Sequence, residues 1–161
     1  MSKLFIDSNI ILYLLSGDAA KADRAQALLE AGAVISVQVL NEVTSVCLRK
    51  LKMPWGEIDA LLLAVKAACE VLPLTLASHE KAVELARRFQ LSFYDANIVA
   101  CALQSGAPVV LSEDKFLGSE PKFTEPAARP KGAVLCTAVK LVSDPNNLRL
   151  VVRNPFKTDE T

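Results

Sequence analysis

Short apolar runs and longer amphipathic segments alternate along this chain. The apolar runs have the length of buried strands and lie at 4–6, 33–36, 71–74 and 108–111. Helices are predicted where apolar residues recur at helical spacing, at 19–31, 37–51, 57–69 and 78–89. Two more helices are expected, one opening after the capping types Ser8 and Asn9 and one between Ser92 and Gly106. The pattern predicts a three-layer α/β/α sandwich with a mainly parallel central sheet.

The pattern becomes less regular after Gly118. Prolines at 121, 126 and 130 lie in a polar stretch that is typical of an exposed loop. Residues 132–142 are apolar and fit either a strand or a helix, whereas 148–152 read as a last strand. Pro73 places the 71–74 strand at a sheet edge or makes it weak. With 161 residues, the chain is expected to form one domain, 1–161.

Composition narrows the classes of protein that are possible. The formal net charge of +0 argues against a protein that coats nucleic acid by charge alone. The four cysteines, Cys47, Cys69, Cys101 and Cys136, are far apart, which excludes a zinc-ribbon pattern and favours buried, reduced thiols in the cytoplasm. No signal peptide and no membrane span are predicted.

The candidate chemistry lies in four acidic residues. Asp7 and Asp114 directly follow apolar strands, whose carboxyl ends share one edge of a parallel sheet, where ligands bind in open α/β folds. Glu42 lies in the early part of a mostly apolar helix, and Asp95 lies in the first turn of another. Because those helices begin at the same edge, both side chains can reach it. A cluster of four carboxylates is therefore predicted.

Clustered carboxylates repel one another, and a divalent cation relieves that repulsion. Oxygen ligands without histidine or cysteine favour Mg²⁺ or Mn²⁺. Cations held in this way support hydrolysis of phosphodiesters by activated water, often with two metal ions. The expected activity is therefore metal-dependent cleavage of a phosphodiester.

Each acid also has a purely structural interpretation. Asp7 and Asp95 are both suited to capping helices, the latter in a capping box with Ser92. Glu42 could pair with Arg49 or a nearby lysine, and Asp114 could be a turn residue. The adjacent Glu113 competes with Asp114 as the fourth acid.

Four short blocks carry a resemblance to a known family. They are Phe5-Ile6-Asp7-Ser8-Asn9-Ile10, Leu40-Asn41-Glu42-Val43, Ser92-Phe93-Tyr94-Asp95-Ala96 and Leu111-Ser112-Glu113-Asp114. Together, and in this order, they resemble the signature blocks of PIN-domain ribonucleases, above all the VapC-type toxins of toxin–antitoxin pairs. The resemblance covers most of the chain up to about Gly118.

The resemblance implies a PIN fold, a Mg²⁺- or Mn²⁺-dependent endoribonuclease, an antitoxin protein partner and a homodimer. It assigns metal binding to Asp7, Glu42, Asp95 and Asp114, and supporting roles to Ser8, Asn9 and Ser112. The chain departs from the family's pattern near its end. Residues 119–147 look inserted before the last strand, which ends in Asn154-Pro155-Phe156 as similar proteins do.

Two other functions fit parts of the pattern. A phosphatase of the strand-end aspartate type needs a second Asp two positions after the first, where Asn9 stands instead. The other is a PIN-like scaffold that binds a partner without catalysis, and the presence of all four acids argues against it. The lone histidine, His79, is read as a surface residue.

The sequence does not decide the roles of several basic residues and several apolar helix residues. Phosphate contacts could come from Arg49, Lys50, Lys52 or Lys115, although solvated helix ends and loops are the preferred explanation of these cations. Apolar helix residues fit either the core or an interface with a second copy or an antitoxin, and they are Tyr13, Leu14, Trp55 and 61–63.

Overall fold

The computed structural model describes residues 4–107, 109–112, 141–143 and 149–153, with side chains for the first two ranges. Its strands form one sheet and comprise β1 (Leu4–Ile6), β2 (Ala33–Ser36), β3 (Cys69–Leu72), β4 (Val109–Leu111), β5 (Leu141–Ser143) and β6 (Arg149–Arg153). The helices are α1 (Ser8–Leu12), the 3-10 turn η1 (Tyr13–Leu15), α2 (Ala19–Glu30), α3 (Val37–Arg49), α4 (Trp55–Ala68), α5 (Leu76–Phe89) and α6 (Phe93–Gln104). The predicted alternation of strands and helices is confirmed.

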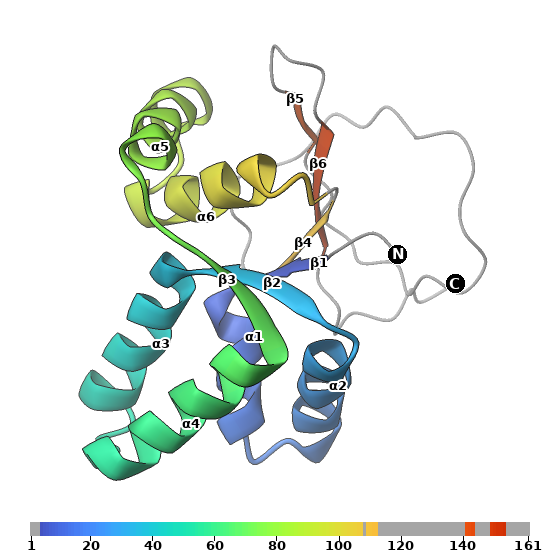
Figure 1. Cartoon of the computed structure of the whole chain (residues 1–161), viewed down its shortest axis with the longest axis vertical. Coiled ribbons are helices and arrows are strands. Elements are labelled where there is room, and N and C mark those ends of the chain that lie inside the picture. The colour runs from blue at the N-terminus through green and yellow to red at the C-terminus, as the bar shows by residue number, and fades with distance from the viewer. Residues whose placement is uncertain (1–3, 108, 113–140, 144–148, 154–161) are drawn as a thin grey trace, which may run out of the picture.

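The order of the strands determines where the helices lie. The sheet runs β3-β2-β1-β4-β6-β5, and all neighbours are parallel except β5 and β6. Right-handed crossovers from β1 to β2 to β3 place α1–α4 on one face of the sheet. The return from β3 to β4 places α5 and α6 on the other face, as Figure 1 shows. The predicted three-layer α/β/α sandwich is therefore confirmed.

The reversal of direction beside β1 creates a switch point. The chain leaves β1 for β2 on one side, and β4 later pairs with β1 on the other side. At such a point the connections diverge from the carboxyl ends of the two strands, which opens a crevice above them. Asp7 follows β1 and Ser112 follows β4, so both lie at this crevice.

Local sequence explains where the elements end. Gly32 and Gly106 have φ values of +81° and +72°, which are left-handed conformations that close α2 and α6 without a Cβ penalty. The strand predicted at 71–74 lies instead at Cys69–Leu72 and ends before Pro73, which has no backbone N–H to donate to a neighbouring strand. β3 is an edge strand, as expected. The last strand pairs in parallel with β4.

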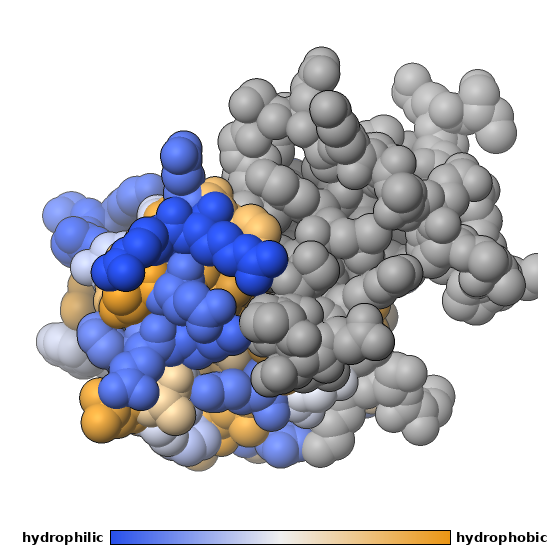
Figure 2. Space-filling model, turned by 90° about the horizontal axis from the view of Figure 1, so that it is seen from above, coloured by the Kyte–Doolittle hydropathy of each residue, from blue (hydrophilic) through white to orange (hydrophobic). Residues whose placement is uncertain are grey.

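The core fills the space between the sheet and both helix layers. Its largest fully buried side chains include Phe5 and Ile6 of β1, Ile35 of β2 and Ile98 of α6. Helix α6 is buried along almost its whole length, whereas α5 covers it and is charged outside. Figure 2 looks down on that end of the molecule and shows a mostly hydrophilic surface with smaller hydrophobic areas between. The exposed charges of α5 are thus a solvated helix face.

Several predictions fall wholly or partly outside the described residues. They concern Glu113, Asp114, Lys115, Cys136 and the proposed insertion at 119–147, of which only 141–143 is described. Within the described residues, Cys47, Cys69 and Cys101 are buried free thiols, as predicted. No helix among those residues combines the length and apolar character that crossing a bilayer requires.

Candidate active site

Asp7 serves two structural purposes at the end of β1. It is the N-cap of α1, and its Oδ1 accepts a hydrogen bond of 2.6 Å from the backbone N–H of Ser8. Its Oδ2 accepts a 2.7 Å bond from the hydroxyl of Ser112, which follows β4. The predicted capping role is therefore real, but the side chain also links the ends of two central strands. Only 2% of Asp7 is exposed.

The hydroxyl of Ser8 connects two carboxylates from different elements. Its Oγ lies 2.7 Å from Oε2 of Glu42 and 3.3 Å from Oδ1 of Asp7. A hydroxyl carries one hydrogen, so it donates to one carboxylate at a time, and the shorter distance favours Glu42. Glu42 on α3 is thereby held next to the capped end of β1.

Gln38 completes the support of Glu42. It lies one turn earlier on α3, and its Nε2 donates a 2.8 Å bond to Oε1 of Glu42. Both carboxylate oxygens of Glu42 thus accept a hydrogen bond. Among the described residues Glu42 forms no ion pair with Arg49 or a lysine, so the pairing considered from the sequence is not seen.

Asn9 extends the network on the side of β4. Its Nδ2 donates a 3.1 Å bond to Oγ of Ser112, the hydroxyl that in turn donates to Asp7. The chain of contacts therefore runs from Asn9 through Ser112, Asp7 and Ser8 to Glu42. The three polar residues predicted to support the acids all lie in direct contact with one another or with an acid.

Asp95 approaches from the opposite helix layer. Ser92 is the N-cap of α6, and its Oγ accepts a 3.2 Å bond from the backbone N–H of Asp95. The same hydroxyl lies 2.7 Å from Oδ2 of Asp95. The predicted cap at Ser92 is confirmed, and the Asp95 carboxylate is held by the cap's side chain.

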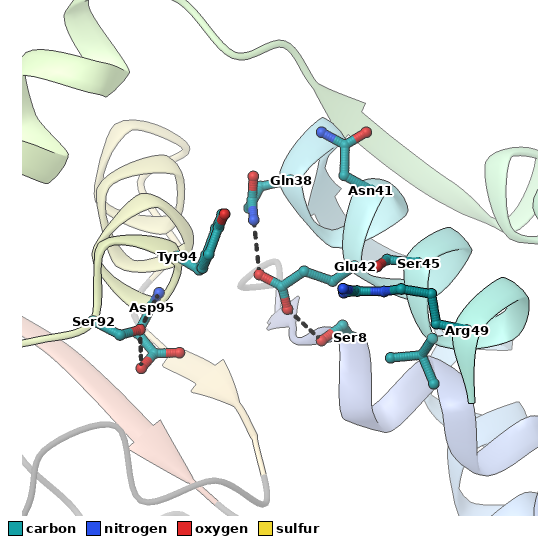
Figure 3. A pocket seen from close by; sticks show the side chains of 10 residues that line it. Ser8, Gln38, Asn41, Glu42, Ser45, Arg49, Ser92, Tyr94 and Asp95 are labelled. Atoms are coloured by element: carbon teal, nitrogen blue, oxygen red, sulfur yellow. Dashed lines mark hydrogen bonds between the residues drawn. The ribbon is translucent and has the colours of Figure 1, made fainter.

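A cavity of about 510 Å³ lies between α3 and α6. Glu42 and Asp95 line it from opposite sides, and Ser8 forms part of its floor (Figure 3). Its complete lining consists of Ser8, Gln38, Asn41, Glu42, Ser45, Val46, Arg49, Ser92, Tyr94 and Asp95. Asp7 is not among these residues, and it lies behind Ser8. The structure therefore brings Glu42 and Asp95 to one cavity, and the Ser8 hydroxyl links Asp7 to Glu42.

The described acids do not form a ready-made metal cluster. Within residues 4–107 and 109–112 no group of three or more histidine, cysteine or acidic side chains converges closely enough to hold an ion. The fourth predicted acid, Asp114, lies outside this range. The donor chemistry nevertheless suits a hard cation, since every acidic group at the cavity offers carboxylate oxygens.

Sequence reasoning overlooked some residues of the cavity. Gln38 had a usable signal, because it lies four residues before Glu42 and so shares its helix face. Tyr94 lies within a block that was recognised, but only the structure shows that its ring lines the cavity (Figure 3). Asn41 and Ser45 carried no signal beyond their position on α3.

An acid-lined cavity at the switch point of a doubly wound sheet defines a class of α/β protein that binds its ligand above the strand ends. Comparison of the sequence with known families assigns the chain to one family within that class. The family model of the PIN domain matches residues 4–117, and the chain belongs to the PIN domain family. The family predicted from the four sequence blocks is confirmed.

Solved structures share the fold at low sequence identity. A toxin–antitoxin complex from Klebsiella pneumoniae is 22% identical, with a TM-score of 0.57 over 74% of this chain and 93% of that one. VapC20 of Mycobacterium tuberculosis, a toxin that cleaves the sarcin–ricin loop, is 21% identical, with a TM-score of 0.52 over 67% and 87%. VapBC2 of Rickettsia felis, bound to a promoter DNA fragment, is 17% identical, with a TM-score of 0.53 over 69% and 87%. No match was found among curated protein sequences.

Proposed function

We propose that this protein is a metal-dependent endoribonuclease and the toxin of a toxin–antitoxin pair. The single observation that carries the proposal is the cavity in which Glu42 and Asp95 face each other, with Asp7 bonded behind Ser8. Membership of the PIN domain family supports it, as does the likeness to structures described as toxins. An antitoxin partner, a homodimer, a cytoplasmic location and a single domain over 1–161 belong to the same proposal.

The acids fit Mg²⁺ or Mn²⁺ by their chemistry. Asp7, Glu42, Asp95 and Asp114 would hold the cation, which when bound supplies Lewis-acid activation of water and of the phosphodiester. Ser8 and Gln38 fix the orientation of the Glu42 carboxylate through its two oxygens. Ser112 donates to Oδ2 of Asp7 from the end of β4, and Asn9 in turn donates to the Ser112 hydroxyl. These neutral donors hold the carboxylates in place without neutralising their charge, so the charge stays available to a cation.

The direct test is cleavage of RNA by the purified chain with Mg²⁺, Mn²⁺ or EDTA, compared with the variants Asp7→Asn and Asp95→Asn. Asparagine caps helices about as well as aspartate, so Asp7→Asn keeps the cap of α1 while it removes the charge. We expect both variants to stay folded by circular dichroism and to lose at least about tenfold to a hundredfold in rate, the loss that even outer-shell changes at a metal site produce. Glu57→Gln, an exposed acid of α4, serves as the matched control and keeps full activity.

Two outcomes would count against the proposal. Cleavage that survives in both variants, or that persists in EDTA, would mean that the acids are not the nuclease site. A folded protein that binds Mn²⁺ in a titration but cuts no RNA would favour the binding scaffold over the enzyme. Size-exclusion chromatography with light scattering tests the homodimer separately.

A further inference from the structure

Tyr94 presents an exposed aromatic ring to the acidic cavity. It lies in the first turn of α6, is 66% exposed and lines the cavity beside Asp95. Its neighbour Phe93 faces elsewhere and contacts the ring of His79 edge-on at 5.3 Å. Figure 3 shows the Tyr94 side chain extending into the cavity towards Gln38. An aromatic face left open to solvent at this point is a surface on which a flat ligand can stack.

Arg49 contributes a positive charge from the other wall. It lies two turns after Glu42 on α3, and its guanidinium group points into the cavity in Figure 3. Within the described part of the chain, no carboxylate forms an ion pair with it, although two acids line the same cavity. A guanidinium that is not engaged by the nearby acids is available to bind a phosphate.

These two side chains come from opposite walls of the cavity, Tyr94 beside Asp95 on α6 and Arg49 on α3 with Glu42. The cavity volume of about 510 Å³ falls within the range of sites that accept small ligands. A stacking ring on one wall and a phosphate-binding group on the other, each on the same helix as one of the acids, match the base and the phosphate of a nucleotide. Bases in a duplex are already stacked and paired, whereas an unpaired base can leave its neighbours and stack on an aromatic side chain.

We propose that Tyr94 and Arg49 bind one unpaired nucleotide of the substrate, with Tyr94 stacking on its base and Arg49 contacting an adjoining phosphate. This inference rests on the proposed nuclease function and adds the residues that would position the strand. Tyr94 acts through its π-face, so its hydroxyl is not required. Arg49 acts through charge and hydrogen bonding, so its contribution falls as the salt concentration rises.

Binding without cleavage tests this directly. The probe is a fluorescein-labelled single-stranded RNA 12-mer, titrated with the full chain in EDTA and again in Ca²⁺, and read by fluorescence anisotropy. Tyr94→Ala is expected to raise Kd by about tenfold or more, as the loss of one base stack does, while Tyr94→Phe stays near the wild type. Arg49→Gln is expected to raise Kd and to reduce the slope of log K against log salt by about 0.7, as for one phosphate on a single strand.

Matched variants and probes separate these roles from general damage. Trp55→Ala removes another exposed ring and Arg88→Gln another exposed cation, and neither residue lines the cavity, so both keep wild-type Kd. An abasic 12-mer should bind the wild type as weakly as the normal RNA binds Tyr94→Ala. Tyr94→Ala should bind the abasic 12-mer with the same Kd as it binds the normal RNA. A duplex of the same sequence should bind more weakly than the single strand.

The outcomes distinguish this inference from the proposed function. If the wild type cuts RNA but Tyr94→Ala and Arg49→Gln bind and cut normally, the inference is wrong and the nuclease stands. If the wild type cuts nothing but its binding depends on both side chains, the inference stands and the enzyme is wrong. A wild type that shows no binding in either EDTA or Ca²⁺ overturns the inference.

Discussion

The Ser8 hydroxyl is within hydrogen-bonding distance of two carboxylates. It lies between the carboxylates of Asp7 and Glu42, which come from different elements of the fold. Hydrogen bonds to charged groups are worth more than neutral ones, and an acceptor that loses its donor keeps its desolvation cost. Ser8 therefore helps the protein tolerate two neighbouring acids when no cation is present.

We predict that Ser8→Ala lowers the free energy of unfolding of the metal-free protein by about 1–3 kcal/mol, the scale of a lost bond to a charged acceptor. Urea unfolding followed by circular dichroism measures it. Ser45→Ala is the matched control, because Ser45 lines the same cavity but no hydrogen bond is described for its side chain. Equal stability of the two variants would show that the Ser8 bridge contributes nothing.

At the scale of elements, helix caps position the chemistry. The cap of α6 at Ser92 also holds the Asp95 carboxylate, whereas the cap of α5 at Thr75 contacts only backbone and the buried Ser78. Ser92 lines the cavity and Thr75 does not, so only the loss of the Ser92 cap is expected to affect the cavity.

We predict that Ser92→Ala and Thr75→Ala each lower the free energy of unfolding by about 1 kcal/mol, the usual cost of a lost N-cap. Only Ser92→Ala should also reduce metal-dependent RNA cleavage, because it removes the hydroxyl that lies 2.7 Å from Oδ2 of Asp95. Thermal unfolding and cleavage rates, measured side by side, separate the two effects. Parallel losses of activity in both variants would mean that stability alone controls the rate.

Two glycines at the ends of helices give predictions of opposite sign for the change in the free energy of unfolding. Gly106 has a φ of +72°, and Gly56 lies near the start of α4 without a positive φ; neither has an atom within 4 Å of an added Cβ. Gly106→Ala should therefore destabilise the fold by about 1–2 kcal/mol through left-handed strain. Gly56→Ala should stabilise it by about 0.5–1 kcal/mol through reduced chain entropy. Chemical denaturation measures both, and a shared sign would contradict the assignment.

At the scale of the whole molecule, the buried thiols tie stability to alkaline pH. Burial raises the pKa of the Cys69 thiol from 9.0 to about 11. The pKa values of Cys47 and Cys101 are also raised, chiefly by burial. A raised pKa in the folded state favours the neutral thiol there, so the stabilising effect is complete below pH 9 and is lost as the pH rises towards 11.

We predict that the free energy of unfolding falls between pH 9 and 11, and that Cys69 contributes to the fall because burial raises the pKa of its thiol in the folded protein. Urea midpoints across this pH range measure it. Cys69→Ala should remove that part of the slope while the other ionising groups keep theirs. An unchanged slope in the variant would show that the pKa of the Cys69 thiol is the same in the folded and unfolded chains.

Hydrophobic periodicity alone determined most of the architecture. The strand at 4–6 and the strand at 33–36 were predicted with the bounds that the structure has, because apolar runs this short, followed by residues that cap helices, are typical of buried strands. The glycine that closes α6 and the proline that directly follows the edge strand β3 act through local backbone geometry. Effects of this kind can be predicted from the residue type alone. The acids Asp7, Glu42 and Asp95 were found for the same reason, by their places at the ends and starts of elements.

Only the tertiary structure decided how these residues meet. The crossing from β3 back to β4 puts α6 on the opposite face from α3, and that reversal brings Asp95 to the cavity that Glu42 lines. The hydrogen bond between Ser112 and Asp7 joins residues 105 positions apart, and no local pattern encodes a contact over that separation. Tyr94 lies in a recognised sequence block and Arg49 was a candidate for a phosphate contact, but only the structure shows that both line the cavity. The exposure of a side chain depends on what the rest of the chain packs around it.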